Sequence, residues 1–479
     1  MFCTQGLNAE GQAYFDNLYQ YDDRVEGVSI EGTVKLSDGY MSWIYTSPTA
    51  EAFGNAGLVM TDFDGNVTNS QELPLIDTIW DIVRNIIALN DTTFIALSFE
   101  QNLSVNTPGD MILRKLNRDG VVSWKQTYGD TGQLDVPQRV ALTDDGGYIM
   151  VGQVTIETQS GQEADGWLVK VDVDGNLQWE QTYGGSDYDA TSDVIQTPDE
   201  GYLLLGWSRS FGLGQRDFYL IKTDSNGNEE WHETYGTEAE EGGKSILHLS
   251  DGNYLLTGSG TNTQLTESLG RLYKVEPDGN VIWSDIYTFE NNTGHNFHKT
   301  IEMWNGDLVS VGMTNLNSNA GWLVRTNSLG EVLWQREYDK NGQTDLFYSL
   351  LATDDGGFLL SGQAVNEQTN SQDAWLLKVD SMGCTFPNCI TGIDQTEKTV
   401  VVDVWPNPVN DVLNIVLPDF SARSSVEMTI TDMSGREMLR FQEQNEHAEI
   451  DVSTWNRGVY MLTGTDEKGR IFSLRIVKQ

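Results

Sequence analysis

The chain has 479 residues, a length that predicts one or two large domains rather than a small scaffold held together by disulfides. It carries 71 Asp and Glu against 29 Lys and Arg, and this formal charge of −42 argues against nucleic acid as a partner because a phosphate backbone would be repelled. No run of about 18 apolar residues is present, which excludes a transmembrane helix.

The first residues, 1–12, have neither the charged region nor the apolar region of a secretory signal. We therefore interpret residues 1–12 as the remnant of a leader or as a disordered segment.

Seven copies of one pattern follow, each with a tight turn and then an apolar strand that contains a large anchor residue. Successive anchors lie 50 to 54 residues apart. The anchors are Tyr40, Phe94, Tyr148, Tyr202, Tyr254, Leu308 and Phe358. A fixed period of this length is the signature of a repeat architecture.

Each copy continues into a second signature, most clearly at 165–185: an apolar strand, an Asp-Gly turn and a strand that carries Trp and Tyr. The Trp position is held by Trp124, Trp179, Trp231, Trp283 and Trp334, and by Asn69 in the first copy. One unit thus contains four short strands joined by tight turns, which is the pattern of a β-propeller blade.

The seventh copy stops after its third strand, at 374–380, and lacks the strand with Trp. Residues 15–19 match 179–183 in phase and are followed by a stretch, 25–33, that reads as the first strand of a blade. We therefore predict an all-β fold in which residues 13–382 form a seven-bladed β-propeller, closed by the N-terminal strand so that no sheet edge is left open.

These repeats, over about residues 15–380, resemble the tryptophan-containing propeller repeats of secreted bacterial proteins and, more distantly, quinoprotein-type blades. The resemblance does not extend to a quinone pocket, because the calcium and cofactor ligands of those enzymes have no match. We expect no resident cofactor; loose binding of calcium by the acidic surface stays open.

Residues 383–399 read as a linker. Cys384 and Cys389 enclose four residues, a spacing that permits one small disulfide loop in an oxidising compartment and would leave Cys3 over. A zinc site is not expected, because no second pair of cysteines and no nearby histidine completes four ligands.

From residue 400 the period disappears, and alternating apolar and polar residues at 413–417 and 426–430 predict half-buried strands. Residues 400–479 are therefore expected to form a separate, small antiparallel β-sandwich.

This segment resembles the type A C-terminal sorting domain of the type IX secretion system of Bacteroidota. The residues that carry the resemblance are Pro406, Asn407, Pro408, Gly435, Gly458, Tyr460 and Lys478. The resemblance implies export, recognition by the type IX secretion machinery at the outer membrane, and a secreted or cell-surface location.

The repeat phase also predicts a candidate site. The first strand of a propeller blade lines the central channel, and the positions nine and ten residues before the anchor are expected near its mouth. The side chains expected there are Arg84, Arg139, Asp193, Lys244, His298, Lys299 and Tyr348. In a chain of charge −42 these cations would form a local positive funnel for an anion such as a carboxylate, a sulfate or a uronate.

Other interpretations of these residues stay open. The cations can instead form ion pairs with Asp193, Glu31 or loop carboxylates. His295 and His298 are weak evidence for a metal because no third ligand is apparent, and we assign no metal site. The segments 62–66 and 172–176 resemble the start of a calcium loop, but Asp-Gly is also a preferred hairpin turn.

The sequence thus favours an exported propeller that binds a glycan, peptide or protein ligand, with no catalytic residue assigned. The alternative is a hydrolase or lyase that acts on polysaccharide or peptide at the channel mouth, with Asp193, His298 and Tyr348 as acid and base candidates.

Overall fold

The computed structural model describes residues 5–7, 13–19, 28–46, 55–72, 79–102, 108–129, 133–158, 161–261, 268–289, 294–315, 319–340, 344–366, 371–386, 403–405, 409–416, 426–432, 436–443, 447–466 and 471–478. The chain divides into two compact units, Met1–Cys389 and Ile390–Gln479. Within the described ranges, no helix is long and apolar enough to cross a membrane.

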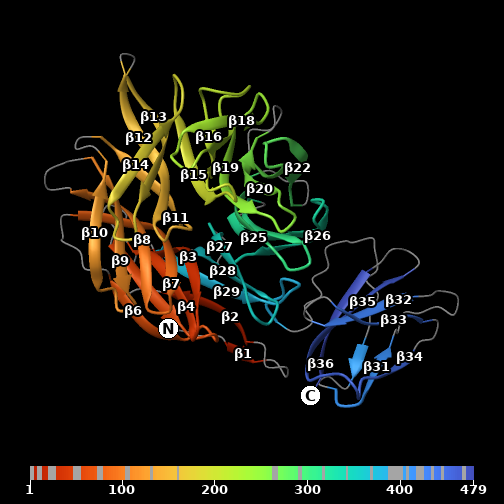
Figure 1. Cartoon of the computed structure of the whole chain (residues 1–479). Coiled ribbons are helices and arrows are strands. Elements are labelled where there is room, and N and C mark those ends of the chain that lie inside the picture. Colours follow the sequence, from red (N-terminus) through yellow and green to blue (C-terminus); the bar gives the residue numbers. More distant parts are fainter. Residues whose placement is uncertain are drawn as a thin grey trace. The chain divides into compact units, whose positions relative to one another are not determined.

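The first unit consists of antiparallel sheets that follow one another in chain order, each built from four consecutive strands except the last (Figure 1). The strand that comes first in each sheet is called the inner strand below. The inner strands are β3 (Val28–Leu36), β7 (Ile79–Asn90), β11 (Asp135–Leu142), β15 (Asp189–Gln196), β19 (Glu241–His248), β23 (Asn296–Glu302) and β27 (Leu346–Ala352).

The second strands contain the anchors, and the third strands pair with them. The second strands are β4 (Gly39–Thr46), β8 (Thr93–Asn102), β12 (Tyr148–Thr158), β16 (Tyr202–Ser208), β20 (Tyr254–Gly260), β24 (Leu308–Asn315) and β28 (Phe358–Asn366). The third strands are β5 (Asn55–Thr61), β9 (Asp110–Asn117), β13 (Gly161–Val171), β17 (Asp217–Thr223), β21 (Leu269–Val275), β25 (Asn319–Thr326) and β29 (Ser371–Val379).

The outer strands are β6 (Val67–Glu72), β10 (Val122–Tyr128), β14 (Leu177–Tyr183), β18 (Glu229–Tyr235), β22 (Val281–Tyr287) and β26 (Val332–Tyr338). All of them except β6 carry the recurring Trp and Tyr. In β14 and β22 the Trp is partly buried, the final Tyr is buried and the other side chains are exposed, as expected for strands at a sheet edge.

The outer strand of the last sheet comes from the N-terminus, as the repeat phase predicts. Strand β2 (Ala13–Tyr19) pairs antiparallel with β29, and Leu18 lies opposite Trp375. The indole Nε1 of Trp375 donates a hydrogen bond of 2.7 Å to Asp16 Oδ1, which adds a side-chain contact to the pairing. Strand β1 (Gln5–Leu7) pairs with β2 in turn, so part of the segment expected to be a leader remnant or disordered is a strand here.

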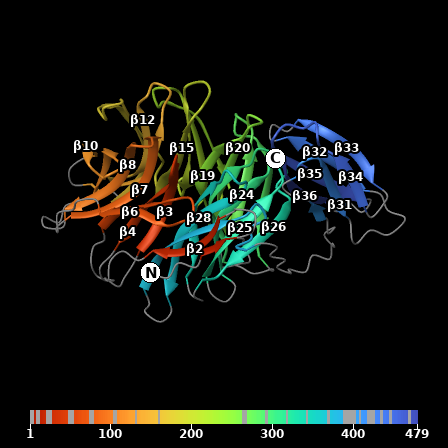
Figure 2. The same ribbon diagram turned by 90° about the horizontal axis from the view of Figure 1, so that it is seen from below.

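The sheets contact one another in sequence. Each inner strand packs against the inner strand of the next sheet, from β3 to β7 through to β23 and β27, and β27 and β28 pack against β3. Figures 1 and 2 both show the cyan strand β28 beside the red-orange β3. The succession of sheets therefore returns to its start.

In five of the outer strands, β10, β14, β18, β22 and β26, a Tyr and a Trp dock on a glycine of the following sheet. The Tyr183 hydroxyl donates a hydrogen bond of 2.6 Å to the carbonyl oxygen of Gly227, and a Cβ built on Gly227 would meet the Trp179 ring at 2.5 Å. The same hydrogen bond joins Tyr19 to Gly65, Tyr128 to Gly175, Tyr235 to Gly279, Tyr287 to Gly330 and Tyr338 to Gly383. The recurring aromatic residues thus hold adjacent sheets together.

An ion pair inside the sheets also recurs. Lys170 of β13 is buried and its Nζ lies 2.8 Å from Asp145 Oδ2 in the turn after the inner strand. Equivalent pairs join Lys222 to Asp199, Lys274 to Asp251, Arg325 to Asp307 and Lys378 to Asp355. Since a buried ammonium needs a partner, this pair explains why the turns repeat an Asp.

The second unit contains two antiparallel sheets. One has β30 (Asp403–Trp405), β31 (Val412–Val416) and β34 (His447–Asp451), and the other has β33 (Glu437–Glu443), β32 (Val426–Asp432), β35 (Gly458–Asp466) and β36 (Ile471–Lys478). Leu413 and Ile415 of the first sheet share one buried cluster with Met428 and Ile430 of the second. The alternation read from the sequence therefore places apolar side chains between two sheets.

Candidate functional site

Every inner strand carries a β-bulge at the same phase of the repeat. In β15, for example, Thr191 pairs with Gly206 and Asp193 with Leu205, so Ser192 is the extra residue of the bulge. The extra residues are Glu31, Arg84, Gln138, Ser192, Lys244, His298 and Tyr348. A bulge bends its strand and redirects a side chain, and bulges are frequent beside functional sites.

The bulge exposes one side chain in the middle of an otherwise buried strand. Lys244 is exposed between buried Gly243 and Ser245. Arg84, Gln138, Ser192, His298 and Tyr348 are partly exposed, and the residue before each of them is buried. The inner strands contact one another, so the bulges place a set of polar side chains around the middle of the first unit, called the inner ring below.

Lys244 and His298 belong to one electrostatic cluster of this inner ring. The ring of His298 stacks on that of Tyr348 with centroids 5.2 Å apart and an interplanar angle of 10°. Burial and the charge of Lys244 lower the pKa of His298 to about 4, although a hydrogen bond to the backbone of Phe347 opposes this. His298 is therefore neutral at pH 7.

A cation outside the inner strands joins this cluster. Although Lys244 is exposed as a residue, the protein around it removes part of its hydration and lowers its pKa, and the charge of Arg216 lowers the pKa as well. The Arg216 guanidinium lies over the ring of Trp207, 5.1 Å from its centroid. Among the described residues, neither Lys244 nor Arg216 forms an ion pair with a carboxylate.

Arg139, Asp193 and Lys299 form a second cluster, one residue beyond the bulges. Arg139 Nε lies 3.5 Å from Asp193 Oδ1, and Lys299 Nζ lies 3.5 Å from Ser349 Oγ. Burial and the charge of Arg139 lower the pKa of Lys299 to about 8, although Asp193 opposes this. The cationic form of Lys299 is thus only moderately favoured at neutral pH.

Both carboxylate oxygens of Asp193 accept hydrogen bonds from backbone N–H groups. Its Oδ2 accepts a hydrogen bond of 3.0 Å from Ile246 N on the inner strand of the next sheet, and its Oδ1 accepts one of 2.9 Å from Val194 N. Asn85 makes the same connection, because its Oδ1 accepts from Val140 N at 3.1 Å. The position after the bulge therefore links successive inner strands.

The structure thus divides the seven predicted side chains between two positions of the inner strands, the bulge and the residue after it. Arg84, Lys244, His298 and Tyr348 occupy bulges, whereas Arg139, Asp193 and Lys299 follow them. Of the expected ion pairs, that of Arg139 with Asp193 is present. Sequence reasoning did not single out Trp207 or Arg216. Trp207 lies near the end of β16 and Arg216 lies just before β17, and neither residue type recurs at this position in the other repeats. The bulges themselves left one signal, a polar residue recurring inside apolar strands.

The segments that resemble calcium loops are hydrogen-bonded turns. Asp172 Oδ1 accepts from Asp174 N at 2.9 Å and from Asn176 N at 2.8 Å, and its Oδ2 accepts from Asn176 Nδ2 at 2.9 Å. Asp62 bonds its own turn through the same atoms. These carboxylates satisfy the turn backbone, which supports the hairpin interpretation.

His295 and His298 also have different surroundings. His295 is fully buried, and its ring centroid lies 5.1 Å from that of Trp322. Its Nε2 accepts a hydrogen bond from Phe289 N. Over the described parts of the chain, no group of three His, Cys, Asp or Glu side chains is placed to hold a metal ion.

The remaining predicted positions lie near or in the second unit. Cys384 is disulfide-bonded, whereas Cys389, Pro406, Asn407, Pro408 and Gly435 lie outside the described residues. Gly458 opens β35 and lies opposite Lys478 of β36. Tyr460 is buried, packs on Trp455 at 4.9 Å and donates a hydrogen bond of 2.8 Å to Asn456 O. The described residues of this motif thus serve the packing of one sheet.

Residues 403–479 match the family described as the secretion system C-terminal sorting domain. This chain carries a sorting domain of the type IX secretion system and is a secreted or cell-surface protein. No curated protein matches the chain by sequence.

Three solved structures to which the chain is similar are the following. The β-propeller domain of the trilobed protease from Pyrococcus furiosus is 9% identical, over 74% of this chain and 96% of that domain, with a TM-score of 0.43. PorZ, a surface component of the type IX secretion system of Porphyromonas gingivalis, is 12% identical, over 100% of this chain and 74% of PorZ, with a TM-score of 0.30. A PL25 ulvan lyase is 8% identical, over 77% of this chain and 97% of the lyase, with a TM-score of 0.48. At these TM-scores none of them decides what this chain does.

Proposed function

We propose that the first unit is a closed seven-bladed β-propeller that binds the anionic group of an extracellular ligand at its inner ring. The contact of the last sheet with the first and the N-terminal strand in the last sheet support the closed ring. The second unit, a small β-sandwich, serves recognition by the secretion machinery.

One observation carries the binding proposal. The backbone of Arg216 contacts the start of the strand that carries Lys244, the charge of Arg216 lowers the pKa of Lys244, and in the described structure no carboxylate forms an ion pair with either. Two cations held together are unfavourable by themselves, so an anion bound between them would be stabilised by both. In a chain of net charge −42, such a pair of cations attracts an anion locally.

The proposal is tested by binding of acidic glycans and acidic peptides to the full chain. We expect the wild type to bind an acidic ligand and the quadruple variant Arg84→Ala, Arg139→Ala, Lys244→Ala, Lys299→Ala to lose most of that binding. The single variant Lys125→Ala, an exposed position on the outer strand β10, is the control and should bind normally. Unchanged binding by the quadruple variant would exclude these cations of the inner strands as the site.

An enzyme is the second candidate. The neutral imidazole of His298, next to Tyr348, is the observation that favours it, because an unprotonated imidazole is available as a base, although a pKa of about 4 makes it a weak one at pH 7. Against it, both carboxylate oxygens of Asp193 are engaged by backbone N–H groups. Incubation with acidic polysaccharide separates the two functions: a binding protein retains the polymer intact, whereas an enzyme shortens it.

A further inference from the structure

Arg216 contacts the segment that leads into the inner strand of the next sheet. Its backbone bridges to Glu240, and its carbonyl oxygen accepts a hydrogen bond of 2.6 Å from Glu241 N, the first residue of β19. Lys244, the bulge residue of β19, follows three residues later. This backbone contact between two sheets thus holds Arg216 beside the strand that carries Lys244.

The segment that carries Arg216 is held at both ends. At its start, Asp189 Oδ1 accepts hydrogen bonds from Arg209 N at 3.1 Å and from Ser210 N at 3.3 Å. At its end, Asp217 Oδ2 accepts from Leu213 N at 2.8 Å and from Gly214 N at 2.9 Å. The segment is therefore ordered without a ligand, and the conformational cost of ordering Arg216 does not fall on binding.

The chemistry of Arg216 narrows the ligand group. A guanidinium that lies over an indole keeps its N–H donors at its edge, and this planar fork matches a carboxylate or a sulfate with two parallel hydrogen bonds. Lys244 adds a point charge beside it. Arg216 and Lys244 together therefore suit a ligand with one oxyanion rather than a ligand with several anionic groups.

The rest of the inner ring narrows the ligand further. Gln138 and Ser192 are neutral, partly exposed, and able to donate and accept hydrogen bonds. The imidazole of His298, neutral at pH 7, stacks on the ring of Tyr348, and the two rings provide an aromatic contact. A ligand with one charged group and several hydroxyls fits such a ring, whereas an acidic peptide with many charges would be repelled by the rest of a protein of charge −42.

We propose that Arg216 and Lys244 clamp the oxyanion of an acidic saccharide, a uronate or a sulfate ester, while its hydroxyls face the neutral bulge residues. This inference rests on the proposed function and adds the class of ligand and Arg216 as a binding residue.

Calorimetry of the full chain tests the class of ligand with four probes: a trisaccharide ending in glucuronate, the same trisaccharide ending in a sulfated glucose, the neutral trisaccharide, and octaglutamate. We expect one or both acidic trisaccharides to bind at least about tenfold more tightly than the neutral one and than octaglutamate, because charge-assisted hydrogen bonds are the strong ones. The two acidic probes tell a uronate from a sulfate ester.

Two variants test the role of Arg216. Arg216→Lys keeps the charge and removes the fork, so we expect binding of the acidic trisaccharide to weaken about tenfold with binding of the neutral one unchanged. Arg209→Lys, an exposed position in the same segment, is the matched control. Lys244→Gln provides a second variant, on another strand, that should weaken the same probe.

The outcomes separate the two proposals. If octaglutamate binds and the acidic trisaccharides do not, the proposed ligand class, an acidic saccharide, is wrong, whereas the proposed anion-binding function is retained. If Arg216→Lys and Arg209→Lys change the affinity for the acidic trisaccharide equally, Arg216 is not a residue of the binding site. If none of the three acidic probes binds, both proposals fall.

Discussion

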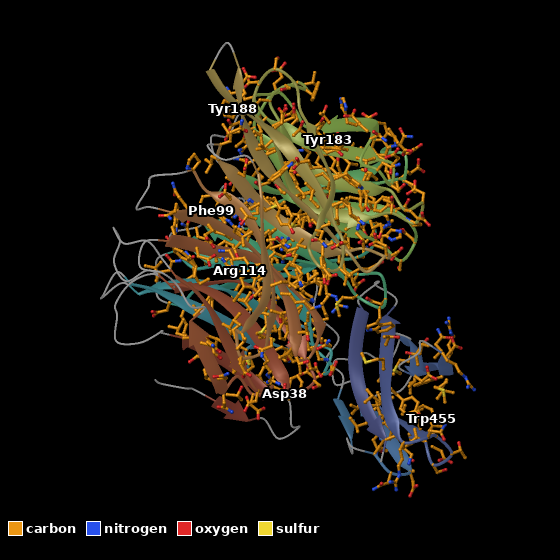
Figure 3. The ribbon with its side chains drawn as sticks, turned by 60° about the vertical axis from the view of Figure 1, so that its left-hand side comes forward. Asp38, Phe99, Arg114, Tyr183, Tyr188 and Trp455 are labelled. Carbon is orange, nitrogen blue, oxygen red and sulfur yellow. The ribbon has the colours of Figure 1, made fainter. Side chains whose placement is uncertain are left out.

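The Tyr183 hydroxyl of one sheet donates a 2.6 Å hydrogen bond to the Gly227 carbonyl oxygen of the next. Both partners recur along the chain, so one local contact is repeated between successive sheets. Figure 3 labels Tyr183 and also Tyr188, which lies in the connection between β14 and β15 and serves as a comparison.

Removing this hydroxyl should destabilise the first unit. We expect Tyr183→Phe to lower the free energy of unfolding by about 1–2 kcal/mol, because a buried carbonyl oxygen loses its donor. Urea denaturation followed by tryptophan fluorescence measures the change. Tyr188→Phe, at a ring that is 40% exposed, is the control and should cost less. Equal costs would mean that the contact between sheets is not stabilising.

The glycine of this contact is constrained in two ways. Gly227 has a φ of 78° and little room for a Cβ beside Trp179, whereas Gly252 has a φ of 87° and open space. We expect Gly252→Ala to cost about 1 kcal/mol from backbone strain alone and Gly227→Ala to cost more. The difference between the two free energies of unfolding measures the tight fit of Trp179 and would vanish if the indole could move aside.

The pair of Lys170 and Asp145 should make stability depend on acid pH. Burial raises the pKa of Asp145, but hydrogen bonds from Lys170, Thr143 and Gly147 outweigh it and lower the pKa to about 2. A carboxyl with a folded pKa below its unfolded pKa stabilises the protein above the unfolded value, and this contribution is lost as the pH falls through the folded pKa.

Asp145→Asn is therefore expected to lower the midpoint of thermal unfolding at pH 7, and its difference from the wild type should shrink between about pH 4 and pH 2. Asp144→Asn, at the exposed neighbouring residue, is the control. A difference that stayed constant over this range would show that the ion pair does not titrate as described.

Binding of an anion at the inner ring should weaken in mild alkali. Burial and the charge of Arg139 lower the pKa of Lys299 to about 8, so this cation is lost as the pH passes from 7 to 9, whereas His298 with a pKa of about 4 does not change in that range. We expect affinity for an acidic ligand to fall several-fold over this interval. In Lys299→Arg the fall should be smaller, since arginine remains charged, and what remains of it reports Lys244, whose pKa is also lowered.

Chelation should leave the first unit intact. The carboxylates of Asp62, Asp172 and Asp224 accept hydrogen bonds from their own turns and are not left for a calcium ion. We expect EDTA and added calcium to leave the midpoint of thermal unfolding unchanged, as measured by circular dichroism. A calcium-dependent rise abolished by Asp172→Asn would instead identify this turn as a calcium site.

Much of the fold could be predicted from residues that act locally. The spacing of Tyr148 and Tyr202, the Asp-Gly turns and the apolar alternation mark strands and turns directly, because strand faces alternate every second residue. The match of 15–19 to 179–183 predicted the partner of β29, and Tyr19 bonds Gly65 as Tyr183 bonds Gly227. The sequence also placed Arg84, Lys244, His298 and Tyr348 at one equivalent position.

The side chains that meet at that position were decided by the tertiary structure. A bulge depends on how two strands pair, and the meeting of Arg216 with Lys244 depends on the contact of two sheets, neither of which is written in the local alternation of either segment. The chain alone therefore determined the period, the strands and the sorting domain. Packing between sheets determined which cations lack a carboxylate, because charges far apart in sequence interact only once the sheets are in place.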